Sequence, residues 1–146
     1  MAKLERRIIH HLQQFPLELG TGFAFIGRQV RFTSNQEHFI VDLVFYNRLL
    51  RCFVLFDLKI GKLEQQDIGK MQMYVRHYDR NVKLPEENPT IGIILCKDKN
   101  NTVVEITFPE DNSPIFASKY QTVLPSKESL QKLLQEQVTK NDDDDE

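Results

Sequence analysis

Two apolar segments that each carry charge constrain this chain most. Ile40–Tyr46 and Phe53–Lys59 have the composition of buried strands, yet Asp42 interrupts the first and Asp57 the second. Because side chains alternate between the two faces of a strand, Asp57 and Lys59 share one face. If the short turn between the segments makes a hairpin, one register places Asp42 directly across from Asp57. Two carboxylates and an ammonium would then meet at one point.

Such a cluster has a specific chemical use. Two carboxylates whose Cβ atoms lie about 5 Å apart repel each other unless a proton or a cation lies between them. Mg²⁺ binds one or two carboxylates together with waters and phosphate oxygens, and a neighbouring lysine can orient the attacking water. The pattern therefore predicts metal-assisted phosphodiester hydrolysis. The alternative is an ordinary surface ion pair worth under about 1 kcal/mol, but charge in both apolar segments favours a functional site.

Hydrophobic periodicity and turn residues predict the order α-β-β-β-α-β, with additions. Apolar residues recur at helical spacing from about Lys3 to Phe15, and Ser126 is a suitable N-cap for a last helix. The remaining expected elements are a strand near 23–33, the two charged strands, a helix over 63–79, and strands over 90–96 and 103–108. We expect a single mixed α/β domain over residues 1–140 and an acidic tail over 141–146.

Composition agrees with a nucleic-acid enzyme without requiring one. Five of the 21 acidic residues form the block Asp142–Glu146, so 19 basic residues face 16 acidic ones in the rest of the 146-residue chain. No apolar run reaches the ~18 residues of a membrane span, and a cytoplasmic location is the expectation. Cys52 and Cys96 lie in apolar runs and are expected to be free, buried thiols. The four histidines lack the spacing of a zinc site.

Four longer strings resemble a known family. Asp42 followed by Asp57-Leu58-Lys59 matches the metal-binding signature of the PD-(D/E)XK nuclease superfamily. The strings are similar to the YhcG-type family of bacterial nucleases within it, over about Leu12 to Pro125; they are LELGTGFAFIGRQ, VDLVFYNRLLRCFVLFDLKIGKL, QDIGKMQMYVRHYDR and ENPTIGIILCKDK. The resemblance implies a restriction-endonuclease-like core with a central mixed sheet flanked by helices. It also implies hydrolysis of nucleic acid with Mg²⁺ or Mn²⁺, with DNA favoured over RNA.

The resemblance assigns roles to individual residues. Asp42 and Asp57 match the metal-ligating acids, Lys59 matches the catalytic lysine, and Glu18 falls where relatives place a further metal-binding acid. An ordinary solvated acid is the alternative for Glu18. The following helix carries Gln72 as a further catalytic candidate. The expected nucleic-acid contacts are Arg28, Lys62, Lys70 and Tyr74, and a core position is the alternative for Tyr74.

Three positions depart from the family pattern. Val41 stands where the superfamily's name has Pro, and Asp57 stands where this family is expected to carry Glu, so the carboxylate is roughly 1.5 Å shorter. Lys70 stands where Gln is expected and adds positive charge near the site. The last two keep a second interpretation open, in which the domain binds nucleic acid or a partner protein without cleaving. A homodimer and a further N-terminal DNA-binding domain, as in longer relatives, are also expectations.

Overall fold

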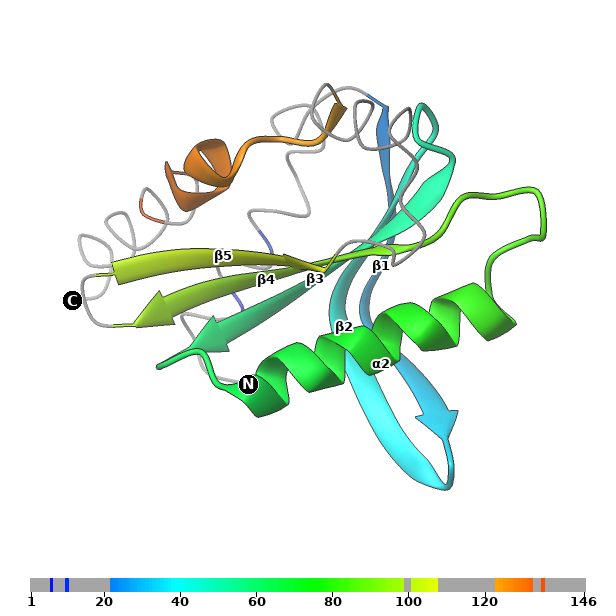
Figure 1. Ribbon diagram of the computed structural model, residues 1–146, viewed down its shortest axis with the longest axis horizontal. Helices are drawn as coiled ribbons and strands as arrows, with labels where there is room; N and C mark the ends of the chain where they lie inside the picture. The colour runs from blue at the N-terminus through cyan, green and yellow to red at the C-terminus, as the bar shows by residue number, and fades with distance from the viewer. Residues whose placement is uncertain are drawn as a thin grey trace.

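The described residues form one mixed five-stranded sheet with α-helical segments. The computed structural model describes Arg6, His10, residues 22–98, 101–107 and 123–132, and Gln135. The strands lie in the order β1-β2-β3-β4-β5, and only the β3–β4 pair is parallel. The elements are β1 (Phe23–Ser34), β2 (Glu37–Asn47), β3 (Cys52–Ile60), α2 (Gln65–Asn81), β4 (Ile91–Asp98) and β5 (Asn101–Thr107). The connection from β3 to β4 runs through α2 (Figure 1).

The predicted order is confirmed for the described elements, and most boundaries move by one to three residues. Arg6 and His10 are helical, but the rest of the predicted first helix lies outside the described residues. α2 begins at Gln65, two residues after the predicted start, because Glu64 is an extended N-cap whose backbone N–H donates to Asp67 Oδ2 at 2.9 Å. β5 begins at Asn101 and not at Val103, since Asp98 and Asn101 still pair across the turn.

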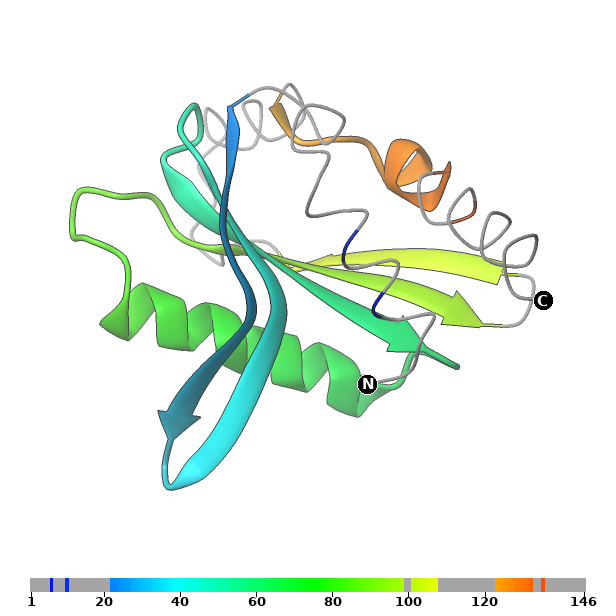
Figure 2. The same ribbon diagram turned by 180° about the vertical axis from the view of Figure 1, so that it is seen from behind.

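Two hydrophobic layers cover the two faces of the sheet. On one face, α2 packs its buried residues against Val44, Leu55 and Ile94 of the strands; those helix residues are Met71, Tyr74, Val75 and Tyr78. The other face is covered by residues 123–132, whose Leu130 is fully buried (Figure 2). Ser126 caps this last helical segment by accepting the Ser129 N–H at 3.1 Å, as predicted. The predicted apolar residues Leu133 and Leu134 lie outside the described residues.

The β1–β2 hairpin continues past α2 as a projecting arm (Figure 1). Aromatic contacts join this arm to the helix, because the Phe32 ring stacks on His77 at 4.0 Å and meets Tyr74 edge-on at 5.5 Å. Phe39 also faces Tyr74, with ring centroids 6.2 Å apart. The hairpin is thus tied to α2 while its tip extends beyond it, which fixes the direction in which β2 leaves the sheet.

The cysteines are free and buried, as expected, with Cys52 and Cys96 at 0% and 1% exposure. Within the part of the chain that the structure describes, no helix is long and apolar enough to cross a membrane.

Candidate active site

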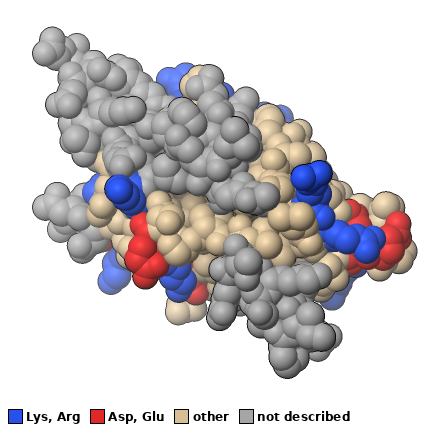
Figure 3. Space-filling model, turned by 90° about the horizontal axis from the view of Figure 1, so that it is seen from above, with Lys and Arg blue, Asp and Glu red and all other residues tan. Residues whose placement is uncertain are grey.

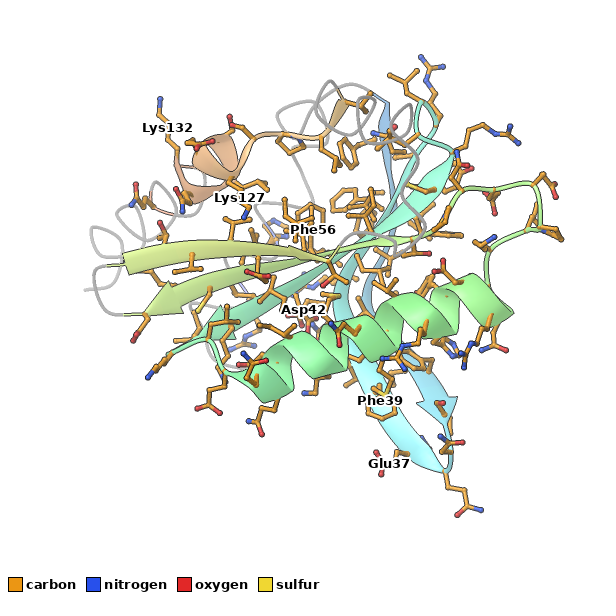
Figure 4. All side chains as sticks on the ribbon, in the orientation of Figure 1. Glu37, Phe39, Asp42, Phe56, Lys127 and Lys132 are labelled. Carbon is orange, nitrogen blue, oxygen red and sulfur yellow. The ribbon has the colours of Figure 1, made fainter. Side chains whose placement is uncertain are left out.

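The site lies where β2 and β3 separate. The two strands pair from Asn47–Cys52 to Leu43–Phe56, which is the register predicted from the sequence. Beyond that point β2 continues with β1 into the hairpin arm, while β3 continues beside β4 (Figures 1 and 2). Asp42 and Asp57 are the next residues on the two strands, so both stand at this fork. Figure 4 shows Asp42 between the sheet and α2.

Each aspartate satisfies a backbone group that the separating strands leave unpaired. The Asp42 N–H donates to Asp57 Oδ1 at 3.1 Å, and the Leu58 N–H donates to Asp42 Oδ2 at 2.8 Å. Because β2 and β3 stop pairing at this point, the carboxylates serve as acceptors for these main-chain N–H groups. Local folding therefore holds the two acids in place, because the fork needs acceptors at these two positions.

A third donor comes from β1. Gln29 Nε2 donates to Asp42 Oδ1 at 2.6 Å, so both oxygens of Asp42 accept hydrogen bonds. Gln29 ends the family-like string LELGTGFAFIGRQ, but no motif in the sequence predicts a role for it. Its backbone has φ of 52°, in the left-handed region, and no sequence pattern here predicts that conformation for a residue other than glycine.

The two carboxyl groups are close enough to share one cation. Asp57 Oδ1 accepts the main-chain N–H of Asp42, and burial together with the charge of Asp42 raises the pKa of Asp57 to about 7. Burial also raises the pKa of Asp42, against hydrogen bonds from Leu58 and Gln29 that lower it. Such a pair needs either a shared proton or a cation near neutral pH. Its oxygen ligands suit a hard divalent ion such as Mg²⁺ or Mn²⁺, so the residues fit the metal that the resemblance implies.

The structure gives no position for the third predicted metal ligand. Glu18 lies outside the described residues, and among the described ones no group of three or more acids, histidines and cysteines surrounds the pair. The described part of the site is therefore a two-carboxylate site.

The two lysines predicted near the pair lie on different elements. Lys59 on β3 contacts Asp67 of α2, with Nζ and Oδ2 3.4 Å apart, and its side chain is 30% exposed. Asp67 Oδ2 also accepts the Glu64 N–H, so the first turn of α2 holds the Lys59 ammonium. Lys70, one turn further along α2, lowers the pKa values of both carboxyl groups through its charge.

The other predicted residues divide into three places. Tyr74 is 2% exposed and belongs to the core beneath α2, which was the alternative for it; its hydroxyl has a raised pKa because of burial and the charges of Asp57 and Asp42. Gln72 is exposed and lies about 160° around the helix from Lys70, on the other side of α2. Arg28 and Lys62 are exposed, on β1 and on the loop after β3.

Positive charge on the surface is divided among separate groups. Figure 3 shows lysines and arginines at both ends of one face, with acidic residues beside them and uncharged residues between. Among the described residues seen on this face, the basic side chains form separate groups and not one continuous surface.

A family model described as "YhcG PDDEXK nuclease domain" matches residues 1–138. The chain belongs to this family. A relative from Escherichia coli (strain K12), named "Putative nuclease YhcG", is 40% identical over 126 residues. That alignment covers 86% of this chain and 34% of the relative, so the chain spans about a third of the relative's length.

A solved structure supports the same fold for this YhcG-family domain. The crystal structure of a repair endonuclease from Pyrococcus abyssi superposes with a TM-score of 0.50 at 18% identity. The match covers 67% of this chain and 39% of the endonuclease chain. The restriction-endonuclease-like fold predicted from the sequence is therefore confirmed; at this identity the likeness concerns the fold alone.

Proposed function

We propose that this domain is a divalent-metal-dependent nuclease that hydrolyses phosphodiester bonds, with DNA favoured over RNA by analogy with the family. The observation that carries the proposal is the buried Asp42–Asp57 pair at the β2–β3 fork. Uncharged side chains could accept the main-chain N–H groups of the fork without the cost of placing two carboxylates side by side, so the structural role does not explain why both residues are acids. Divalent metal binding gives a reason for it.

The proposed roles follow from the positions of the side chains. Asp42 and Asp57 would hold Mg²⁺ or Mn²⁺, with Glu18 as a further proposed ligand. When bound, such an ion stabilises charge on a phosphate oxygen and lowers the pKa of a water molecule. Lys59 would donate to the attacking water or to a phosphate oxygen, while Asp67 keeps its ammonium oriented. Lys70 would contact a phosphate, with Arg28 and Lys62 as outer contacts.

A second candidate function rests on the Lys59–Asp67 ion pair. An ammonium held by Asp67 at 3.4 Å is partly withdrawn from the carboxylate pair. If that contact persists when nucleic acid binds, the domain would bind without cleaving it. Affinity that falls as salt rises would then report contacts with phosphates.

A cleavage assay tests the first proposal and separates it from the second. Supercoiled plasmid, linear DNA and RNA are each incubated with Mg²⁺, with Mn²⁺ and with a chelator. Wild type is compared with Asp42→Asn and Lys59→Ala, and with Lys132→Ala as the matched control, because Lys132 lies on the opposite side of the sheet (Figure 4). We expect metal-dependent cleavage by wild type and Lys132→Ala, and a loss of at least a hundredfold in the two site variants.

Two outcomes of this assay would contradict the first proposal. Cleavage that survives both Asp42→Asn and Lys59→Ala would show that another site is responsible. Binding of DNA by wild type without cleavage in either metal would favour the second candidate function.

A further inference from the structure

We propose that Gln29 is a positioning residue of the carboxylate pair: its amide fixes Asp42 without neutralising the negative charge that a divalent cation needs. This inference rests on the proposed metal-dependent function and assigns a role to a residue outside the acid and lysine set. Three observations carry it, namely the contact itself, the register of β1 and the backbone of Gln29.

The contact between Gln29 and Asp42 is short, and its donor carries no charge. Gln29 Nε2 lies 2.6 Å from Asp42 Oδ1 in a partly buried position, while Oδ2 of the same carboxylate accepts the Leu58 N–H. With both oxygens engaged, Asp42 is held in one orientation. Outer groups that orient metal-binding carboxylates in this way commonly change metal affinity 10- to 100-fold when they are removed.

A bulge in β1 selects glutamine for this place. Phe25 pairs with Phe45 but Gly27 pairs with Val44, so Ile26 is an extra residue on β1. Had the register before the bulge continued, Arg28 would lie opposite Asp42. After the bulge Arg28 pairs with Leu43, and Gln29 comes level with Asp42 between that pair and the Val30–Val41 pair.

The exchange of arginine for glutamine matters chemically. A guanidinium opposite Asp42 would make a charge-assisted pair with the carboxylate and occupy the place of a cation. The glutamine amide donates the same kind of hydrogen bond and leaves the charge of Asp42 unchanged. The bulge thus keeps a positive side chain away from the centre of the site while supplying a donor.

The backbone of Gln29 is also unusual. Its φ of 52° is in the left-handed region, which an L-residue other than glycine enters at a cost. Such residues persist where the surroundings determine them, and they cluster at functional sites. Glycine would relieve the backbone strain here but would remove the amide donor. Stability therefore favours glycine at this residue, whereas the contact with Asp42 favours glutamine.

This opposition gives a test that separates positioning from structural support. Mn²⁺ affinity is measured by titration with detection of free Mn²⁺ by electron paramagnetic resonance, and thermal unfolding is measured in chelator. The variants are Gln29→Met, Gln29→Gly and Gln29→Arg. Gln36→Met and Gln36→Gly are matched controls, because Gln36 is an exposed glutamine with φ of 67° at the tip of the same hairpin.

We expect Gln29→Met and Gln29→Gly to bind Mn²⁺ about 10- to 100-fold more weakly than wild type. Gln29→Gly should nevertheless unfold at no lower temperature than wild type, since its backbone is relieved. Gln29→Arg should bind most weakly of the three, and both Gln36 variants should bind as wild type does.

Mn²⁺ affinity of Gln29→Gly within twofold of wild type would overturn the inference, as would Gln29→Arg binding as tightly as wild type. The Gly variant decides even if Gln29→Met folds poorly. Wild type that binds no Mn²⁺ at millimolar concentration would instead remove the proposed metal-dependent function itself, and this inference with it.

Discussion

The backbone N–H of Asp42 donates to the side chain of Asp57 at 3.1 Å, so the two acids are joined by the fold itself. One residue supplies the donor from its main chain and the other the acceptor from its side chain, across two strands that stop pairing at this level. A substitution at Asp57 therefore affects both the charge of the pair and the support of the β2 backbone. Asparagine is the informative replacement, because its amide oxygen still accepts this hydrogen bond.

The metal-free protein should lose stability as pH rises from about 4 to about 7. The folded pKa of Asp57 is raised from 3.8 to about 7, so the folded state holds a proton that the unfolded state releases at lower pH. The resulting stabilisation is complete below pH 3.8 and is lost as pH passes 7. For a shift of this size it amounts to about 4 kcal/mol, distributed over the Asp42–Asp57 pair.

Urea unfolding in chelator at several pH values measures this slope. Asp57→Asn should flatten the profile over that range, and Glu128→Gln, an exposed acid on the last helical segment, should leave it unchanged. A wild-type profile as flat as that of Asp57→Asn, or one that rises with pH, would contradict the raised pKa.

Divalent metal should stabilise the folded protein, and more so at pH 8 than at pH 5. At pH 5 a proton occupies the carboxylate pair and competes with the metal, whereas at pH 8 the pair is ionised. Mn²⁺ at a hundred times its dissociation constant should add about 3 kcal/mol to the free energy of unfolding. Thermal unfolding with and without chelator measures the effect, and Asp57→Asn should abolish it. An equal shift at both pH values would place the metal elsewhere.

The strands, their register and the Asp42–Asp57 contact could be predicted because they follow from local rules. Alternation fixes which face each acid occupies, and the short turn after Asn47 fixes the register. The partners of the pair could not be predicted in the same way. Gln29 reaches Asp42 only because Ile26 is an extra residue in β1, and no pattern in the sequence identifies that bulge.

The contacts of Asp67 were not predicted either, for a different reason. Glu64 and Asp67 form a reciprocal capping box at the start of α2, but Glu-x-x-Asp departs from the usual Ser/Thr-x-x-Glu/Gln pattern, so the sequence did not indicate a start at Gln65. The contact of Asp67 with Lys59 needs the loop after β3 to fold back, which is a tertiary event. Gln72 was assigned from the resemblance, but its place around α2 depends on which residues face the sheet.

Replacing Gly92 with alanine should destabilise the protein by about 1–3 kcal/mol. Gly92 of β4 lies directly beneath α2, and a Cβ there would come within 2.6 Å of Met71 and 2.9 Å of Val75. The helix would have to move away from the sheet and carry Lys70 with it. Gly69→Ala is the matched control: a Cβ on Gly69 meets nothing within 4 Å, and alanine in a helix should add about 0.5–1 kcal/mol.

Chemical denaturation measures both changes. If Gly92→Ala were as stable as wild type, the close packing of α2 on β4 would be wrong. If Gly69→Ala were destabilised by as much as Gly92→Ala, the environment described for this part of α2 would be wrong.

Asp67→Asn should lower the cleavage rate several-fold while leaving the stability within about 1 kcal/mol of wild type. The asparagine oxygen can still accept the Glu64 N–H, but the charge that holds Lys59 is gone. Asp67→Ala should lower the rate to the same level and also lose about 1 kcal/mol of stability with the helix cap. Single-turnover cleavage and urea unfolding separate the two effects. A faster Asp67→Asn enzyme would mean that the ion pair restrains Lys59 and does not position it.

Lys70→Gln should tighten Mn²⁺ binding and weaken DNA binding. The Lys70 ammonium acts on both carboxyl groups, so its removal leaves the pair more attractive to a divalent cation by a factor of about three to ten. The same removal should reduce the salt dependence of DNA binding by about one phosphate contact. Arg76→Gln, an exposed cation on the side of α2 away from Lys70, is the matched control and should not change Mn²⁺ affinity. If Lys70→Gln and Arg76→Gln changed Mn²⁺ affinity equally, the effect would come from net charge alone, and Lys70 would have no special place at the carboxylate pair.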